Sequence, residues 1–282
     1  MAAKAPGVAS APEGTDATAS DVHGTEVEER PRRFEGIPFR AHLLAAVVIF
    51  GSWELYGQLG NPLIMPPPSA VLLGLIEITF GGPLPGALAT SLQLLFLGFL
   101  TALVLGTLLG ILIGRYPLAN RTLGPFLNAL YATPDIALLP LILLWFGFGM
   151  SGRVVVVFLA AFFPIMINTY AGVRDAPRDL LEVASSFGVK SEFGRLRQVI
   201  LPTALPLIMT GYRLGIGRAV VGMAVAEVYL SLGGLGTLIV QYGHAFRTDL
   251  LIAAILPLPL LGIGLTKVFE QIEKRVQYWR HV

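Results

Sequence analysis

Long apolar runs alternate with short polar segments over most of the chain, from about residue 40 to about residue 270. A helix needs about 20 predominantly apolar residues to cross the roughly 30 Å hydrocarbon core of a membrane. Several runs approach or exceed that length. The pattern therefore predicts an all-α membrane protein with six transmembrane helices, at residues 40–58, 88–114, 122–147, 153–172, 204–230 and 249–269.

Residues 1–38 differ in composition from the rest of the chain. They are rich in Ala, Gly, Ser, Thr, Pro and acidic residues, and no apolar run there could bury a core. We predict a disordered cytoplasmic N-terminal tail at residues 1–38 and a single transmembrane domain at residues 39–282. Between the first two spans, residues 65–86 read MPPPSAVLLGLIEITFGGPLPG. We expect an amphipathic helix on the membrane surface there, with Ser69 as its N-cap.

Lysine and arginine residues gather in alternate segments between the predicted spans. Of the 20 Lys and Arg residues, only Arg153 and Arg247 lie in loops on the side opposite the N-terminus, and Arg213 and Arg218 lie inside the fifth span. Positive residues mark the cytoplasmic side of a membrane protein. This bias predicts that both chain termini and the polar segment at residues 174–202 are cytoplasmic. The net charge of +2 is too small to indicate a nucleic-acid partner.

The composition agrees with a membrane location and excludes several kinds of site. Charged residues make up 13% of the chain, about half of the roughly 25% that is usual in soluble domains. The chain has no cysteine, which excludes disulfides, thiolate metal sites and cysteine nucleophiles. The four histidines are scattered, without an HExxH pattern. We predict no metal site and no catalytic residue, because a membrane-embedded enzyme would require a cluster of His or carboxylate side chains in the spans.

Small residues recur at every fourth position of the second predicted span, at Gly98, Ala102, Gly106, Gly110 and Gly114. This spacing gives one helix face without bulky side chains, against which a second helix backbone can pack closely. The pattern predicts close packing inside the bundle. A seam between two copies of the chain is the alternative.

The third predicted span has the features of an interrupted helix. Pro134 and Pro140 each remove a helix hydrogen bond, and broken helices in membranes occur where they abut protein or line a cavity. Tyr131, Pro134 and Asp135 are therefore candidates for the wall of a translocation path. Asp135 could be a solvated residue of that wall, a buried and paired acid, or a proton relay.

The fifth predicted span carries three charged residues, Arg213, Arg218 and Glu227. Intramembrane charges face the interior of a helix bundle or water, so all three are candidates for the same path. Arg213 follows Pro202 by 11 residues, which corresponds to about 16 Å along a helix and a position near the middle of the membrane. Alternatively, Arg213 could satisfy carbonyl groups or pair with an acid on another helix.

The most polar part of the loop at residues 174–202 is DLLEVASSFGVKSEFGRLRQVILP, at residues 179–202. Residues 179–190 predict a short helix with an apolar side, closed at Gly188, because glycine readily adopts the left-handed conformation. A second helix at residues 192–200 is expected to stop before Pro202, since helical geometry is disfavoured for a residue that precedes proline. Two short helices around a glycine turn would form a rigid knob, although the composition also allows an ordinary solvated loop.

This segment resembles the Glu-Ala-Ala loop of the permeases of binding-protein-dependent ABC importers. That pattern is Glu-Ala-Ala, three residues, Gly, and a closing Ile-x-Leu-Pro, and the residues that match its order are Glu182, Val183, Ala184, Gly188, Ile200, Leu201 and Pro202. Val183 replaces the first Ala of the pattern. Gly188 precedes Pro202 by 14 residues, one more than is usual. At 3.6 residues per turn, one residue would rotate the second helix by about 100°.

Other stretches resemble the nitrate, sulfonate, taurine and bicarbonate group of these permeases, among them MPPPS, ATPDIALLPLILLWFGFG, AVAEVY and GGLGTLI. The resemblance implies the type I ABC importer permease fold, with residues 39–282 as a transmembrane permease domain in a bacterial inner (plasma) membrane. It also implies that the chain is the permease subunit of an importer for a small solute. The solute would be an anion such as a sulfonate, taurine, nitrate or bicarbonate.

The resemblance further implies partners. These are a second permease copy in a homodimer, a dimer of cytoplasmic ABC ATPase subunits that bind ATP and Mg²⁺, and a periplasmic or lipid-anchored substrate-binding protein. The loop at residues 174–202 would couple the ATPase to the spans through Glu182, Val183, Ala184, Ser185, Gly188, Leu201 and Pro202. The chain has no GxxxxGK(S/T) motif, so it is expected to bind no cofactor and to hydrolyse no ATP itself.

Two alternatives remain open at this point. The same type of importer could carry a vitamin precursor or an aromatic acid instead of a small anion. A secondary transporter is the alternative class, and it would need paired broken helices in two inverted halves. The sequence shows helix breakage mainly in the third span.

Overall fold

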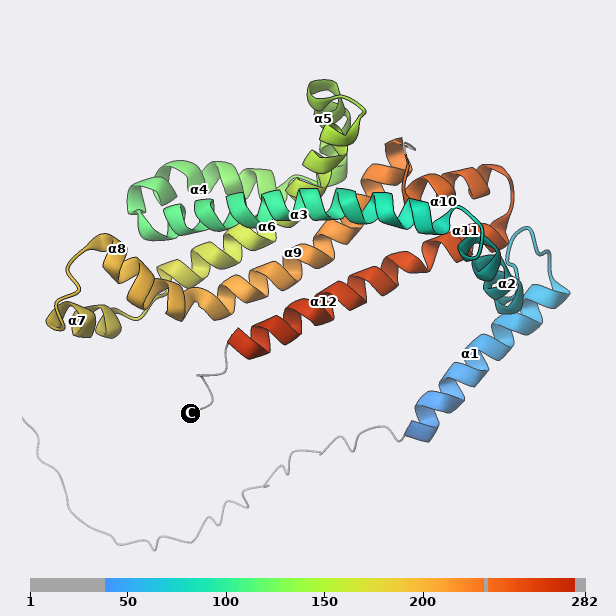
Figure 1. Cartoon of the computed structure of the whole chain (residues 1–282), viewed down its shortest axis with the longest axis horizontal. Helices are drawn as coiled ribbons and strands as arrows, with labels where there is room; N and C mark the ends of the chain where they lie inside the picture. Colours follow the sequence, from blue (N-terminus) through green and yellow to red (C-terminus); the bar gives the residue numbers. More distant parts are fainter. Residues whose placement is uncertain (1–38, 231–232, 277–282) are drawn as a thin grey trace, which may run out of the picture. The chain divides into compact units, whose positions relative to one another are not determined.

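The computed structural model describes residues 39–230 and 233–276, apart from the side chains of Phe39 and Asp135. The predicted disordered tail at residues 1–38 lies outside the described residues. Every regular element within them is helical, which confirms the predicted all-α class. The elements are α1 (Phe39–Leu59), α2 (Pro68–Thr79), α3 (Leu84–Arg115), α4 (Pro117–Ala132), η1 (Asp135–Leu138), α5 (Leu139–Phe146), α6 (Met150–Arg174), α7 (Arg178–Ser186), α8 (Glu192–Arg195), η2 (Leu196–Ile200), α9 (Leu201–Leu230), α10 (Leu235–His244), α11 (Thr248–Ile255) and α12 (Pro257–Val276) (Figure 1).

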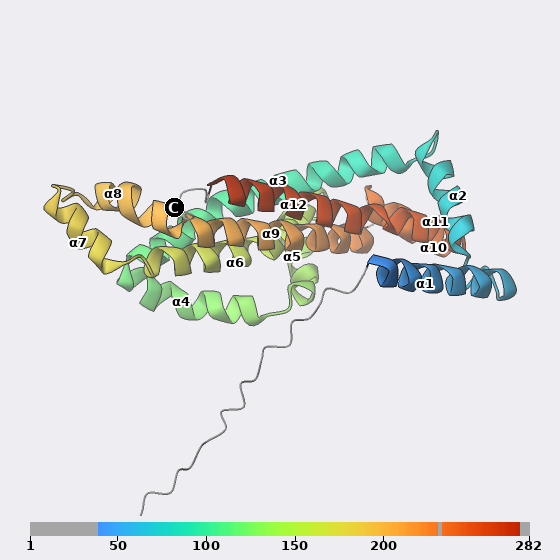
Figure 2. The same cartoon turned by 90° about the horizontal axis from the view of Figure 1, so that it is seen from below.

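Residues 39–45 form the first turns of α1, and all contacts described below lie within residues 46–282. In this larger unit, α7 and α8 lie at one end of the long helices, and α10 and α11 lie at the other end (Figure 2). The helix α9 connects the two ends. Its 30 residues correspond to about 45 Å at 1.5 Å per residue, which is enough to cross a bilayer.

Four continuous helical segments in the described part of the chain are long and apolar enough to cross a membrane. They are Leu84–Arg115, Met150–Arg174, Glu192–Leu230 and Thr248–Val276. The pair α4 and α5 is a fifth candidate, although its two helices are bent by 93°. These five segments lie at five of the six predicted spans. α1 lies at the first predicted span but is not among the candidates, so a total of six stays a prediction.

The bend between α4 and α5 occurs at one of the two prolines that predict it. Pro134 precedes η1 with an extended backbone, φ −60° and ψ 120°. Pro140 instead lies in the first turn of α5, where its missing N–H would have no partner in any case. Only Pro134 therefore lies at the break, and the expectation that Pro140 also interrupts the helix is wrong.

The helix α6 is packed between α3 and α9 through residues that lack side chains. A Cβ atom on Gly98 of α3 would lie 2.5 Å from Cβ of Val157, and one on Gly110 would lie 2.7 Å from the carbonyl oxygen of Met166. On the other side of α6, a Cβ on Gly215 of α9 would lie 2.8 Å from Cγ1 of Ile165. The prediction that the glycine stripe of α3 packs inside the bundle is confirmed.

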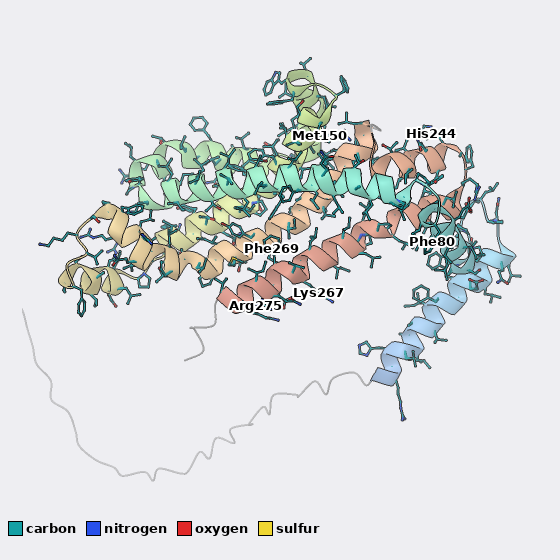
Figure 3. All side chains as sticks on the ribbon, viewed as in Figure 1. Phe80, Met150, His244, Lys267, Phe269 and Arg275 are labelled. Carbon is teal, nitrogen blue, oxygen red and sulfur yellow. The ribbon has the colours of Figure 1, made fainter. Side chains whose placement is uncertain are left out.

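The main core follows from this arrangement. Ile165 is completely buried between Gly106 of α3 and Gly215 of α9. The helix α12 covers the bundle from one side, where Phe269 (Figure 3) packs edge-on against Phe99 of α3 with ring centroids 5.4 Å apart. The remaining buried members of this cluster include Leu94, Leu95, Val157, Phe162, Met166, Ile216 and Met223.

A helix, α2, is present where the surface helix was predicted, and its place on the membrane surface stays a prediction. It packs against α11 and shares a hydrophobic cluster with α10. Its buried face contains Val71 and Ile78. The predicted N-cap is wrong, because Pro67 occupies that position. The backbone N–H and the hydroxyl of Ser69 both donate to the Glu54 carboxylate of α1, at 3.0 Å and 2.7 Å. The Glu54 carboxylate of a neighbouring helix thus accepts a hydrogen bond from a backbone N–H in the first turn of α2, where a serine cap was expected.

We expect Gly110→Ala to destabilise the bundle, because the new methyl group would overlap the backbone of α6. Overpacking of this kind costs about 1–3 kcal/mol, which thermal unfolding of the purified protein in detergent would detect as a lower Tm. Gly86→Ala in the same helix is the matched control, since a Cβ there meets nothing within 4 Å. Equal melting temperatures for the two variants would contradict the packing described for α3 and α6.

Candidate functional site

Two adjoining cavities lie where the bend between α4 and α5 meets α6 and α9. The larger one, of about 330 Å³, is lined by polar groups of the bend and by Tyr131, Phe163 and Arg218. The smaller one, of about 170 Å³, is lined mainly by apolar side chains, among them Val156, Val221 and Val225. Pro134, Ala160 and Arg218 belong to both cavities. The structure therefore brings together three predicted residues of the path, Tyr131, Pro134 and Arg218.

Arg218 supplies the positive charge of these cavities. Its side chain is exposed, and it forms no ion pair with any residue that the structure describes. A guanidinium group remains charged at any physiological pH and presents several N–H donors to an anion. The cavities can therefore bind a negatively charged group at Arg218, with apolar surface beside it.

Arg213 does not line these cavities. Its Nη1 lies 3.5 Å from Oε2 of Glu273 on α12, and Thr210 Oγ1 lies 3.3 Å from Oε1 of the same carboxylate. The structure thus agrees with the alternative in which Arg213 pairs with an acid on another helix. Arg213 and Arg218 are five residues apart, about 140° around a helix at 100° per residue, so they face different neighbours.

Glu227 is also outside the cavities, in a site that is completely buried. Ser91 Oγ of α3 lies 2.7 Å and 2.9 Å from its two carboxylate oxygens, and the backbone N–H of Gly236 donates to it at 3.0 Å. The N–H of Leu235 donates in turn to Ser91 Oγ at 2.9 Å. A Cβ on Gly234 would overlap the carboxylate. Glu227 and Ser91 therefore hold the N-terminus of α10 against α3 and α9.

Two residues near this carboxylate were not singled out from the sequence. Ser91 lies 136 positions from Glu227 along the chain, and one serine in an apolar span carries no signal of its own. Arg153 of α6 is 6% exposed, and its positive charge interacts with the Glu227 carboxylate. From the sequence, Arg153 was expected only in a loop on the side opposite the N-terminus. The remaining candidate, Asp135, lies in η1 next to the bend, and its side chain lies outside the described residues.

The predicted knob is present at the opposite end of α9, and a glycine closes its first helix. α7 ends at Ser186, and Gly188 follows with φ +90°, a conformation that favours glycine. The N–H of Val189 then donates to the carbonyl of Ala184 at 2.9 Å. At the start of the segment, a hydrogen bond from Arg174 lowers the pKa of the Asp175 carboxyl below its ordinary value.

The second helix of the knob does not stop at Pro202 as expected. Residues Glu192–Leu230 form one continuous helix, and the turn just before the proline, η2, is a π-helix. A π turn bonds each N–H to the carbonyl five residues earlier, so it holds one residue more than an α turn. We attribute the extra residue between Gly188 and Pro202 to this turn. The expected rotation of the second helix by about 100° is then unnecessary.

The outer surface of the knob is partly apolar. Leu180, Val183 and Phe187 are 45%, 52% and 84% exposed. Glu182 and Ser185 line a hollow of about 410 Å³, together with Arg178, Leu181 and Arg195. Ala184 is half-buried, whereas Leu201 packs against a small core around Ile200 and Pro202 is exposed. Five of the seven predicted coupling residues, Glu182, Val183, Ala184, Ser185 and Gly188, thus lie in α7 or in the turn that follows it, and Leu201 and Pro202 are the first residues of α9.

Comparisons with known proteins agree on one family. The family described as the binding-protein-dependent transport system inner membrane component matches residues 102–278. A Bacillus subtilis permease named for the transport of aliphatic sulfonates is 34% identical over 241 residues, which are 85% of this chain and 87% of that protein. The taurine transport system permease protein of Escherichia coli is 32% identical over 79% of this chain and 82% of that protein.

A further relative has a different solute in its name, and a solved structure shares the fold. The formylaminopyrimidine transport permease protein of Halalkalibacterium halodurans is 32% identical over 81% of this chain and 91% of that protein. Among solved structures, a chain of the MetNI methionine ABC transporter in an inward facing conformation has a TM-score of 0.61. It is 21% identical and covers 68% of this chain and 95% of its own length.

We expect Ser91→Ala to destabilise the end of the bundle at α10. The variant would leave the buried carboxylate of Glu227 and the N–H of Leu235 each without one hydrogen-bond partner, which costs about 1–3 kcal/mol. Thermal unfolding in detergent is the measurement. Thr101→Ala is the control in the same helix, because the Thr101 hydroxyl is exposed and donates only to carbonyls of its own helix. A Tm of Ser91→Ala equal to that of the wild type would show that the hydrogen bonds of Ser91 with Glu227 and Leu235 contribute nothing to stability.

Proposed function

The chain belongs to the family of binding-protein-dependent transport system inner membrane components, and from that premise we propose that Arg218 receives a small anion in its translocation path. The predicted ABC importer permease fold is confirmed by the family match and by the likeness to the MetNI chain. The protein is therefore the permease subunit of an ABC importer. The observation that carries the proposed solute class is the exposed Arg218 at the junction of the two cavities, where it has no ion-pair partner in the described part of the chain.

The two cavities suit an organic anion in particular. The charged group would bind Arg218 with the polar cavity around it, and an apolar part would fit between Val156, Val221 and Val225. An aliphatic sulfonate has both parts, and the relatives named for aliphatic sulfonates and taurine support this class. Nitrate and bicarbonate have the charge but no apolar part. The relative named for formylaminopyrimidine supports a vitamin precursor as the second candidate.

ATP hydrolysis would take place on a separate pair of cytoplasmic ATPase subunits. The chain itself lacks a GxxxxGK(S/T) loop to hold ATP phosphates and Mg²⁺. The exposed apolar side chains of α7 offer a docking surface for such a subunit, with Glu182 beside them. Val183, which replaces the small residue of the family pattern, is half exposed. Its extra bulk therefore adds to the docking surface without crowding the chain's own core.

The other partners complete the proposal. A periplasmic or lipid-anchored binding protein would deliver the solute to the end of the bundle with α2, α10 and α11. The knob and both termini would face the cytoplasm, as the positive-inside bias favours. A second copy of the chain, in a homodimer, would enclose the path from the exposed side of Arg218. The alternative class, a secondary transporter, does not agree with the family of the chain. It would also need paired broken helices, and among the described residues a strongly bent span is found only at α4 and α5.

We expect Arg218→Gln to reduce solute uptake by about 10- to 100-fold, because the anion loses a hydrogen-bonded charge worth about 1.5–3 kcal/mol. Arg218→Lys should retain part of the uptake. The measurement is ATP-dependent uptake of labelled taurine, an alkanesulfonate and nitrate into proteoliposomes that contain the complete importer. Arg213→Gln is the matched control and should lower the Tm more than the uptake, because Arg213 is paired with Glu273. Wild-type-like uptake of all three anions by Arg218→Gln would refute the role of Arg218.

We expect Gly188→Val to uncouple transport from ATP hydrolysis. Valine is strained at the φ of +90° that Gly188 adopts, so the turn that presents α7 could not form in the same way. Uptake should fall while insertion into the membrane and assembly with the ATPase persist. Lys190→Val, an exposed β-branched substitution two residues further on, is the control. Unchanged ATP-driven uptake in Gly188→Val would rule out the coupling role of this segment.

A further inference from the structure

The coupling helix α7 has few apolar anchors to the rest of the protein. None of its residues is buried, and its larger apolar side chains are mostly exposed. Leu181 is the exception, since it packs against the small core that contains Ile200 and Ala204. One half-buried leucine gives a nine-residue helix little apolar contact with the rest of the protein. Polar contacts must therefore contribute to the orientation that α7 presents to a partner.

A chain of polar contacts connects α7 to the end of α3. Nη2 of Arg195 donates to Oγ of Ser185 at 3.3 Å, and Nη1 of Arg195 lies 3.4 Å from Oε1 of Glu192. The other carboxylate oxygen of Glu192, Oε2, pairs with Arg115. Arg115 is the last residue of α3 and lies 77 positions from Glu192 along the chain. Glu192 thus holds two arginines from two different helices, one with each oxygen.

Glu192 is well placed to serve as this junction. It is the first residue of the continuous helix Glu192–Leu230, and a negative charge is favourable at a helix N-terminus. Ser191 caps the same turn by accepting a hydrogen bond from the N–H of Gly194 at 3.0 Å. The carboxylate is therefore attached to a capped helical turn. Because this turn begins the continuous helix Glu192–Leu230, the carboxylate moves together with the part of α9 that carries Arg218.

We propose that Glu192 is a positioning residue for energy coupling, which ties the coupling helix α7 to the cytoplasmic end of α3. This inference rests on the proposed function of the segment. A displacement of α7 reaches α9 through the backbone. Ser185, Arg195, Glu192 and Arg115 add a direct route to α3, beside the indirect route through the contacts of α3 and α9 with α6. Since α3 and α9 enclose α6, and α6 lines the cavities through Val156 and Phe163, a shift of both helices would move α6 and the cavity wall with them.

The contacts are suited to coupling more than to stability. Both side chains of the Arg115–Glu192 pair are partly exposed, and ion pairs of this kind contribute little to the free energy of folding. The buried glycine contacts of α3, α6 and α9 hold the bundle together without them. Neutral substitutions in the pair should therefore leave the permease folded and assembled, and any loss of coupling can be measured separately from a loss of protein.

The test is a double-mutant cycle on the complete importer in proteoliposomes, with its ATPase subunits and binding protein. The quantity measured is the amount of solute taken up per ATP hydrolysed, for Glu192→Gln, Arg115→Gln and the double variant. Substitutions along a coupling route change the coupling by about two- to thirtyfold, so each single variant should lower this ratio within that range. The double variant should lower it no further than Glu192→Gln alone, because Glu192→Gln already removes the contact that Arg115→Gln removes.

Two controls separate this role from a general effect of charge. Arg121→Gln removes an exposed arginine of α4 that forms no ion pair with the described residues, and it should leave the ratio unchanged. Arg115→Lys keeps the charge and should retain most of the coupling. A ratio equal to the wild type in both single variants, or losses that add in the double variant, would overturn the role of Glu192. A wild-type importer without ATP-dependent uptake would instead refute the proposed function itself.

Discussion

The close approach of α6 to α3 and α9 is the constraint on which the rest of the structure depends. Glycines on both flanking helices face bulky residues of α6, and Ile165 is enclosed by Gly106 and Gly215. In a membrane, helices gain no hydrophobic free energy from each other, so contact at this range is what binds them. The three helices therefore behave as one body. The cavities, the hydrogen bonds of Ser91 and Glu227 at the start of α10, and the knob all lie on or next to these three helices.

Within this body, the three charged residues of α9 have three different surroundings. Arg218 faces the cavities, Arg213 pairs with Glu273 of α12, and Glu227 fastens the start of α10. A charge removed from water requires a partner or water. Among the residues that the structure describes, two of the three charges have ion-pair or hydrogen-bond partners, whereas Arg218 faces the cavities without one. The division follows from helical geometry, since Glu227 lies about 180° around the helix from Arg218.

The knob shows how a departure from a family pattern can leave the shape of a loop intact. One additional residue precedes Pro202, and the structure has a π turn at the same place. Proline lacks an N–H and disturbs the ordinary hydrogen-bond ladder. We attribute the extra residue to this wider turn, which ends just before the first residues of α9. The helix then continues into α9, so the second helix of the knob and Arg218 belong to one continuous helix.

The sequence by itself determined the helical class, the glycine face of α3 and the turn at Gly188, because each depends on local spacing or on backbone preference. It also singled out Tyr131, Pro134 and Arg218, which line the cavities. Only the tertiary structure decided four contacts between helices: the cap of α2 by Glu54, the partner of Arg213, the hydrogen bonds of Ser91 with Glu227, and the pair of Arg115 with Glu192. Each joins residues from different helices. An apolar span shows which residues are charged, but which helix will lie opposite them depends on packing that no local pattern records.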